Sequence, residues 1–274
     1  MFEMYNSDSS EPDTESSSNP ESQSYGGYGY SSQGKTFVVS AGGSIFFGRK
    51  PDTAAMAKFS ETIRRLTAQG NRFVVVAGGG QTARNYVAAG KTLGANNYNL
   101  DKLGILATRL NASLLIESLE GAHSQDFTSV EEAAAAIDSG KVAVFGGLMP
   151  SFTTDAVAAL IAESLGATFI NLSDVDGVYS ADPKKTPRAT FYPKLSYDRL
   201  ISLMKFAKSK PGQKVILDLP CCLILRRSNI RAVIINGHEL ENFERAVRGE
   251  EFTGTVVEDG DEGTSAAHDD LEDA

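Results

Sequence analysis

Three clusters of glycine stand where short apolar runs of the sequence end, an arrangement typical of loops that bind anions. The clusters are Gly42-Gly43, Gly78-Gly79-Gly80 and Gly146-Gly147. Glycine lets backbone N–H groups approach a ligand closely, and a helix that follows adds a partial positive charge. A single loop of this kind is often a purely structural turn. Three of them at one edge of a sheet favour a binding site for an anionic ligand.

Charged and capping residues follow these clusters. Arg84 lies one helical turn beyond Gly80, where a guanidinium can reach phosphate oxygens, although a solvated helix charge is the alternative. Asp101 follows the polar run 96–99, and an ordinary helix N-cap explains it equally well from the sequence alone. Thr153-Thr154-Asp155 precedes an apolar helical pattern and is an N-cap signature, which is compatible with ligand binding.

Several common catalytic motifs are absent from the sequence. It lacks the G-x-G-x-x-G dinucleotide fingerprint. Its one match to G-x-x-x-x-G-K-[ST], GYSSQGKT at residues 29–36, leads into the first expected strand instead of joining a strand to a helix, so we do not expect a phosphate-binding loop of that type. It also lacks a G-x-S-x-G nucleophile elbow. His123, His238 and His268 are scattered, so no cluster has metal-ligand spacing and we predict no metal site built by the protein itself.

Short apolar runs alternate with helical patterns and predict an α/β fold. Strands are expected at residues 36–41, 72–77, 142–145, 168–172, 231–235 and 254–257. Helices are expected around residues 56–66, after Gly80, near 103–119, near 154–165 and near 239–248. This alternation predicts a three-layer αβα sandwich with a mostly parallel central sheet. Ligands of such sheets bind beyond the carboxyl ends of the strands, where the glycine clusters stand.

The negative charge of the chain is concentrated at its ends. The net charge is −9, but residues 36–257 carry 25 basic and 21 acidic side chains. Residues 1–35 are rich in Ser, Gly, Tyr and acids, and residues 258–274 contain eight acids and no Lys or Arg. We therefore predict two disordered tails, 1–35 and 258–274, around one domain at 36–257. The mildly basic domain suits an anionic ligand.

The sequence gives no sign of export or of a membrane span. Cys221 and Cys222 are adjacent, and a disulfide between neighbours would be strained, so we expect two reduced thiols. No secretory signal precedes residue 36, and no run approaches the ~20 apolar residues of a membrane helix. We expect a cytoplasmic protein, with neither nucleic acid nor a membrane as a partner.

Five sequence blocks, taken in order, resemble a known family. They are AGGS (41–44), AGGGQTARNY (77–86), LDKLGILATRLNA (100–112), FGGLMPSFTTDAVAALIAE (145–163) and DVDGVYSADPKKTP (174–187). Together they resemble the archaeal type of UMP kinase, within the amino acid kinase superfamily, over about residues 36–257. The last two blocks are the most specific. The resemblance implies ATP-dependent phosphorylation of UMP to UDP in pyrimidine nucleotide biosynthesis, with Mg²⁺ accompanying ATP, by a homo-hexamer.

The resemblance also implies a role for each matching residue. The residues that would contact ATP are Ser40, Ala41, Gly42, Gly43, Ser44, Gly80, Arg84, Ser173, Asp174, Tyr179 and Asp182. Those that would contact UMP are Gly79, Asp101, Leu148, Met149, Pro150, Ser151, Phe152, Thr153 and Thr154. Arg84, Gly43 and Ser44 would act directly on the transferring phosphoryl group. No general base is expected, because the acceptor is already an ionised phosphate.

The sequence departs from the family pattern at four places. Ser40 stands where many superfamily members have Lys, and Asp174 stands where Asn is usual. The acceptor loop, commonly GTHPGHTTDA, is GLMPSFTTDA here, and Leu223 falls where a Lys is frequent. Two other functions therefore stay open: a kinase for another phosphorylated acceptor, and a diverged protein that binds nucleotide or stores an oxyanion. Isopentenyl phosphate kinases carry a His after the second glycine loop, and residues 81–84 contain none.

Overall fold

The computed structural model describes residues 34–123, 127–209 and 216–259 of the 274-residue chain. The two predicted tails, 1–35 and 258–274, lie almost wholly outside the described residues, so the proposed domain boundaries stay predictions.

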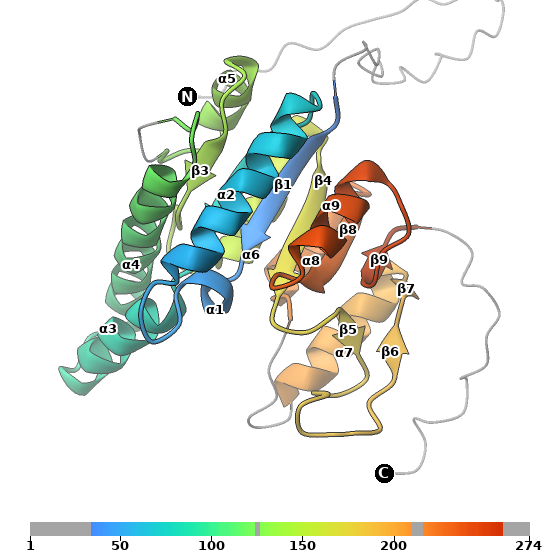
Figure 1. Ribbon diagram of the computed structural model, residues 1–274. Coiled ribbons are helices and arrows are strands. Elements are labelled where there is room, and N and C mark those ends of the chain that lie inside the picture. The colour runs from blue at the N-terminus through green and yellow to red at the C-terminus, as the bar shows by residue number, and fades with distance from the viewer. Residues whose placement is uncertain (1–33, 124–126, 210–215, 260–274) are drawn as a thin grey trace, which may run out of the picture. The chain divides into compact units, whose positions relative to one another are not determined.

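The described residues form a seven-stranded central sheet in the order β3-β2-β1-β4-β8-β9-β7 (Figure 1). The strands are β1 (Thr36–Ala41), β2 (Arg72–Ala77), β3 (Ala143–Phe145), β4 (Thr168–Ser173), β7 (Lys194–Leu195), β8 (Ala232–Asn236) and β9 (Thr255–Val257). All neighbours pair in parallel except β8 and β9, so the expected mostly parallel sheet is confirmed. In register, Ala41 lies opposite both Ala77 and Leu172, which brings the carboxyl ends of three strands to one level.

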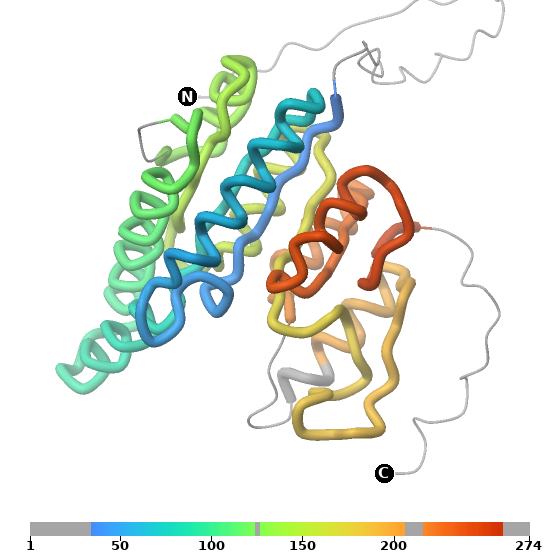
Figure 2. The backbone as a smooth tube through the Cα atoms, viewed as in Figure 1, coloured from blue at the N-terminus to red at the C-terminus, as the bar shows by residue number. Residues whose placement is uncertain are grey.

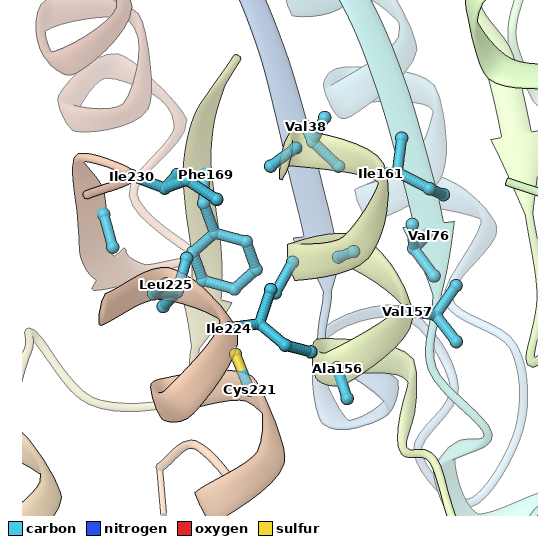
Figure 3. Close-up of a cluster of buried hydrophobic side chains, with 14 of the residues drawn as sticks. Val38, Val76, Ala156, Val157, Ile161, Phe169, Cys221, Ile224, Leu225 and Ile230 are labelled. Carbon is cyan, nitrogen blue, oxygen red and sulfur yellow. The ribbon is translucent and has the colours of Figure 1, made fainter. Parts of the chain in front are cut away.

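Helices cover both faces of this sheet and complete the predicted three-layer αβα sandwich. On one face α2 (Thr53–Ala68), α4 (Asn97–Ser118) and α9 (Leu240–Arg248) pack on side chains such as Val39 and Val75. On the other face α5 (Glu132–Asp138), α6 (Thr154–Leu165), α7 (Tyr197–Ser209) and α8 (Leu219–Arg227) contribute to a second core, which includes Val38, Val76 and Phe169 of the sheet. Figure 3 shows this second layer, where Ile161 of α6 and Ile224 of α8 meet the sheet. Alternate residues of each strand therefore enter opposite cores, as the two-residue period of a strand requires.

The sequence predicted six strands of the central sheet and most of the helices, and it missed several other elements. It gave no indication of α5, of α8, of α7, of β7 or of the hairpin between β5 (Val178–Tyr179) and β6 (Phe191–Tyr192). Two-residue strands carry no measurable periodicity, and α5 consists mostly of alanine, which marks no face. Two further helices, α1 (Gly43–Phe46) and α3 (Gly80–Thr92), begin inside the first two glycine clusters. Figure 2 shows the backbone passing from α3 into α4 at the edge of the sheet.

Both cysteines are free and buried, as expected. They lie in the first turns of α8, which begins after the N-cap residue Asp218. Burial raises the pKa of Cys221 well above its ordinary value and that of Cys222 to about 12. None of the helices in the described part of the chain has the length and apolar character that a membrane span requires.

Candidate active site

The first two glycine clusters pack main chain against main chain at the carboxyl ends of β1 and β2. A Cβ atom added to Gly43 would lie 2.1 Å from the backbone nitrogen of Gly80, and one added to Gly78 would lie 2.4 Å from that of Gly43. Gly80 also has a φ of +57°, in the left-handed region that favours glycine. No larger side chain fits between the two loops. Their backbone amides therefore come close enough together to contact the same group of phosphates.

A cavity of about 250 Å³ opens beside these loops. Residues at the ends of β1, β2 and β4 and at the start of α6 form one side of it: Gly42, Gly43, Ser44, Gly78, Gly79, Thr154, Asp155, Asn171, Leu172 and Ser173. The segment around β5 and the helix α7 form the other: Asp174, Val175, Tyr179, Ser180, Ala181, Asp182, Pro183, Leu203, Met204 and Ile216. The cavity thus has a polar region beside the glycine loops, which suits phosphates, and a partly apolar region beside α7. A nucleotide requires both. Most of the residues predicted to contact ATP line it.

Asp155 is a cavity residue that the sequence did not identify. Its Oδ1 atom accepts hydrogen bonds from Ser40 Oγ at 2.5 Å and from Asn171 Nδ2 at 3.0 Å. Burial raises the pKa of this carboxyl to about 6; the nearby charge of Asp218 adds to the increase, and the bond from Ser40 opposes it. The sequence showed Asp155 only as part of an N-cap signature. The signals that a buried partner lay nearby were the polar residues Ser40 and Asn171, each inside an otherwise apolar strand.

Ser40 and Ala41 end β1 beneath the cavity rather than on its surface. Both are buried, and the Ser40 hydroxyl is directed to Asp155. Gly80 and Arg84 also lie outside the cavity lining. Arg84 is exposed on α3, where its Nε donates to Gln81 Oε1 at 3.1 Å. Direct contacts of these four residues with ATP stay predictions.

The acceptor loop, residues 148–154, leads from β3 into α6. Ser151, at its tip, has a φ of +71°, which is uncommon for a residue other than glycine. Its N–H donates to Asp101 Oδ2 at 2.9 Å. The N-cap interpretation of Asp101 is wrong, because α4 begins at Asn97 and Asn96 caps it. Thr153 does cap α6, as its pattern indicated, through a hydrogen bond from Ala156 N, and its hydroxyl donates to Asp218.

Further polar contacts order the rim of the cavity. Asp174 pairs with the ammonium group of Lys184, with an Nζ–Oδ2 distance of 3.0 Å. Asp182 also lines the cavity, and its carboxylate accepts the backbone N–H of Lys184 at 3.0 Å. Tyr179 packs on Phe191 with ring centroids 5.1 Å apart, and burial together with the charge of Asp176 raises its pKa.

The apolar end of the cavity could not be identified from the sequence. Leu203 and Met204 come from α7, and Ile216 lies beyond it, in a part of the chain to which no element was assigned. The apolar residues of α7 have the spacing found in any helix that packs on a hydrophobic core. Nothing in such a pattern distinguishes a side chain that faces a ligand from one that faces another helix.

Comparisons with known proteins agree with this geometry. Residues 35–236 match the model of the amino acid kinase family. The uridylate kinase of Methanocorpusculum labreanum is 40% identical over 222 residues, which cover 80% of this chain and 94% of the relative. The uridylate kinase of Archaeoglobus fulgidus is 41% identical over 224 residues, covering 80% and 98% of the two chains.

Solved structures show the same fold. The crystal structure of the uridylate kinase from Archaeoglobus fulgidus superposes with a TM-score of 0.72 at 40% identity and covers 81% of this chain and 99% of that one. The UMP kinase of Ureaplasma parvum, at 20% identity and a TM-score of 0.67, supports the fold alone. With its parallel sheet, its adjoining glycine loops and these relatives, the chain belongs to the amino acid kinase family.

Proposed function

We propose that the protein transfers the terminal phosphoryl group of ATP to UMP and releases ADP and UDP, a step in the making of pyrimidine nucleotides. One observation carries the proposal: a nucleotide-sized cavity lies against the main chain of two interlocked glycine loops, with an acceptor loop entering the same wall at Thr154. The similarity to archaeal uridylate kinases over nearly their whole length supports UMP as the acceptor.

The backbone would supply much of the charge stabilisation. Phosphoryl transfer demands alignment and neutralisation of negative charge, and little covalent work from the protein. The Gly78 amide already donates to the carbonyl of Ala41, but the amides of residues 42–44, 79 and 80 and the N-terminus of α3 lie close together and would suit phosphate oxygens. Asp101 would accept the ribose hydroxyls of UMP, and the loop 148–154 would enclose its base.

Magnesium fits the chemistry of this cavity. Among the described residues that line it are three carboxylates, Asp155, Asp174 and Asp182, and no Lys or Arg. The described part of the chain holds no cluster of three or more potential ligands that would form a protein-built metal cage. Mg²⁺ is a hard cation that would arrive bound to the ATP phosphates and need only one carboxylate from the protein, which agrees with both observations. Asp155 would supply that carboxylate. Bound Mg²⁺ would neutralise the charge that spreads over the phosphoryl oxygens.

A coupled assay of ADP release tests the proposal directly. Mg-ATP is supplied with UMP, CMP, AMP or isopentenyl phosphate, and UMP is expected to give the highest kcat/KM. A rate with another acceptor and none with UMP would reassign the substrate. Binding of ATP without acceptor-dependent ADP release would instead favour the non-catalytic nucleotide-binding or oxyanion-storing function.

Replacement of Arg84 by alanine is expected to lower kcat by about 10²-fold, the usual effect of removing one group that stabilises transition-state charge. Arg84 is exposed on the second turn of α3 and would swing from Gln81 toward the phosphates. Lys91→Ala on the last turn of the same helix is the matched control and should leave kcat unchanged. Undiminished activity of the Arg84 variant would remove this residue from the mechanism.

An apolar stripe on α4 supports the expected homo-hexamer. Leu106, Leu110 and Leu114 repeat at helical spacing and are 63%, 64% and 37% exposed. Leu93 and Tyr86 of the neighbouring α3 are also exposed. Exposed apolar patches of this kind mark surfaces of association, and a second copy of the chain is the partner that an oligomer requires.

The double variant Leu106→Glu/Leu110→Glu is expected to dissociate this assembly, because four buried carboxylates would face each other across a two-fold interface. Light scattering coupled to size exclusion should then give a mass below that of six 29.2 kDa chains, because loss of one type of contact divides the hexamer into smaller units. Leu223→Glu places the same change on α8, where the leucine is 39% exposed, and should leave the mass unchanged. A wild-type protein that is already monomeric would contradict the proposal.

A further inference from the structure

Helix α4 lies beside both halves of the site, and its inward side chains bind the main chain of each half. Asn111, which is 4% exposed, donates from Nδ2 to the carbonyl oxygen of Gly78 at 2.8 Å. Gly78 opens the second glycine loop and lines the cavity. One end of this polar contact is thus a backbone group of the loop in which Gly79 would approach the UMP phosphate and Gly80 the ATP phosphates.

Thr108 binds the main chain on the acceptor side. Its Oγ1 accepts the N–H of Gly147 at 2.6 Å and donates to the carbonyl of Ile105 at 2.6 Å. Gly147 comes directly before the acceptor loop 148–154. The methyl carbon of Thr108 also lies 3.3 Å from the position that a Cβ at Gly79 would occupy. The same side chain is therefore hydrogen-bonded beside the acceptor loop and packed against the second glycine loop.

Two other side chains of α4 also bind the main chain in or beside the acceptor loop. Arg109 donates from Nε to the carbonyl oxygen of Gly147 at 3.2 Å, and Asp101 accepts the N–H of Ser151 at 2.9 Å. Within the described residues, side chains of α4 thus reach the start and the tip of the acceptor loop, while Asn111 binds the second glycine loop. A single rigid helix sets the distance between the two loops.

We propose that Thr108 and Asn111 are positioning residues that hold the second glycine loop and the acceptor loop at the separation needed for in-line phosphoryl transfer. The inference rests on the proposed function. Thr108 and Asn111 are three residues apart and lie on one face of α4, so the two backbone groups that they bind cannot shift independently. An error of about 1 Å in the alignment of reacting atoms costs on the order of 10²-fold in rate.

The test is Thr108→Val, which keeps the shape of the side chain and removes both hydrogen bonds. The expected result is a fall of about 10²-fold in kcat for UMP phosphorylation, with the KM values for ATP and UMP within about 3-fold of wild type. Thr108→Ser restores the hydroxyl and should recover most of kcat. Ser113→Ala is the control, since Ser113 lies on the same helix and bonds only its own backbone, at the carbonyl of Arg109.

A bisubstrate compound, adenosine and uridine joined by five phosphates, gives a second readout that needs no turnover. Thr108→Val and Asn111→Ala should bind it at least about 10-fold more weakly while binding ADP and UMP singly as wild type does, because only the joined ligand measures the separation of the two sites. Binding is measured by calorimetry. If one of the two variants folds poorly, the other variant still allows this comparison.

Three results would overturn the inference: unchanged kcat in Thr108→Val, no recovery in Thr108→Ser, or equal weakening of the bisubstrate and of the single nucleotides. The last would show that α4 merely supports the fold. A wild-type protein that binds both nucleotides but transfers nothing would instead refute the proposed function. The two failures are therefore distinguishable.

Discussion

Replacement of Gly43 by alanine is expected to lower kcat for phosphoryl transfer by at least about 10²-fold. The added methyl group would lie 2.1 Å from the nitrogen and 2.6 Å from the Cα of Gly80, and neither backbone atom can rotate away as a side chain would. The first two glycine loops must then separate. Their amides would no longer converge on one set of phosphates, and stability should also fall by about 1–3 kcal/mol, as for other overpacked sites.

Gly48→Ala is the matched control for this change. Gly48 lies in the same connection between β1 and α2, and a methyl group there meets no atom within 4 Å. Its kcat and melting temperature should stay close to those of wild type. The decisive measurements are calorimetric titration with ATP and the ADP-release assay. An active Gly43→Ala protein with wild-type affinity for ATP would show that the close approach of the loops is not needed for binding.

Replacement of Asp155 by asparagine is expected to stabilise the fold at pH 8 while impairing transfer. Burial raises the pKa of this carboxyl from its ordinary value of 3.8 to about 6. The folded state therefore holds its proton more tightly than the unfolded state does. Stability from this group is fully present below pH 4 and is lost as pH rises through 6. The upper limit of the effect is roughly 3 kcal/mol, at about 1.4 kcal/mol per unit of pKa.

Asparagine keeps the shape of Asp155 and can still accept from Ser40 and Asn171 through its oxygen. The variant should therefore gain stability at pH 8, and the gain should vanish as pH falls from 7 to 4. Denaturant unfolding across this range measures it. Kinase activity should fall, with a higher Mg²⁺ requirement, because the cavity loses its inner carboxylate.

Asp138→Asn is the control for the asparagine variant. Asp138 is 75% exposed and lies 3.7 Å from Arg72, and exposed ion pairs of this kind contribute little to stability. Its unfolding free energy should show no comparable change with pH. If Asp155→Asn were less stable than wild type at pH 8, the carboxylate would have to be counted as a structural anion with an unrecognised partner.

The sequence predicted those features that depend on neighbours in the chain. The strands at β1, β2 and β4 and the helix α6 appear where the apolar spacing placed them. The glycine clusters do meet at one edge, because a parallel sheet brings the carboxyl ends of its strands together. Their contact, with Gly43 against Gly80, is a finding of the structure alone.

The features that were missed depend on contacts between distant parts of the chain. Asp155 looked like a helix cap because its partners, Ser40 and Asn171, lie 115 and 16 residues away. Asp101 looked like a cap as well, whereas it binds the main chain of Ser151, 50 residues further on. No local pattern encodes such pairs. Ser40 stands where many superfamily members have Lys, and its hydroxyl donates to the carboxylate of Asp155. The positive charge that the lysine would bring to the transferring phosphoryl group must therefore come from another residue or from Mg²⁺.

The burial of the adjacent cysteines has a practical consequence for experiments on this protein. With both thiols out of solvent and their pKa values far above neutrality, Cys221 and Cys222 should not react with maleimides in the folded state. A single cysteine introduced at an exposed position away from the apolar stripe of α4, such as Lys58 on α2, could then carry a fluorophore without first removing the native pair. Conversely, slow labelling of the native thiols would report the rate at which α8 separates from the sheet.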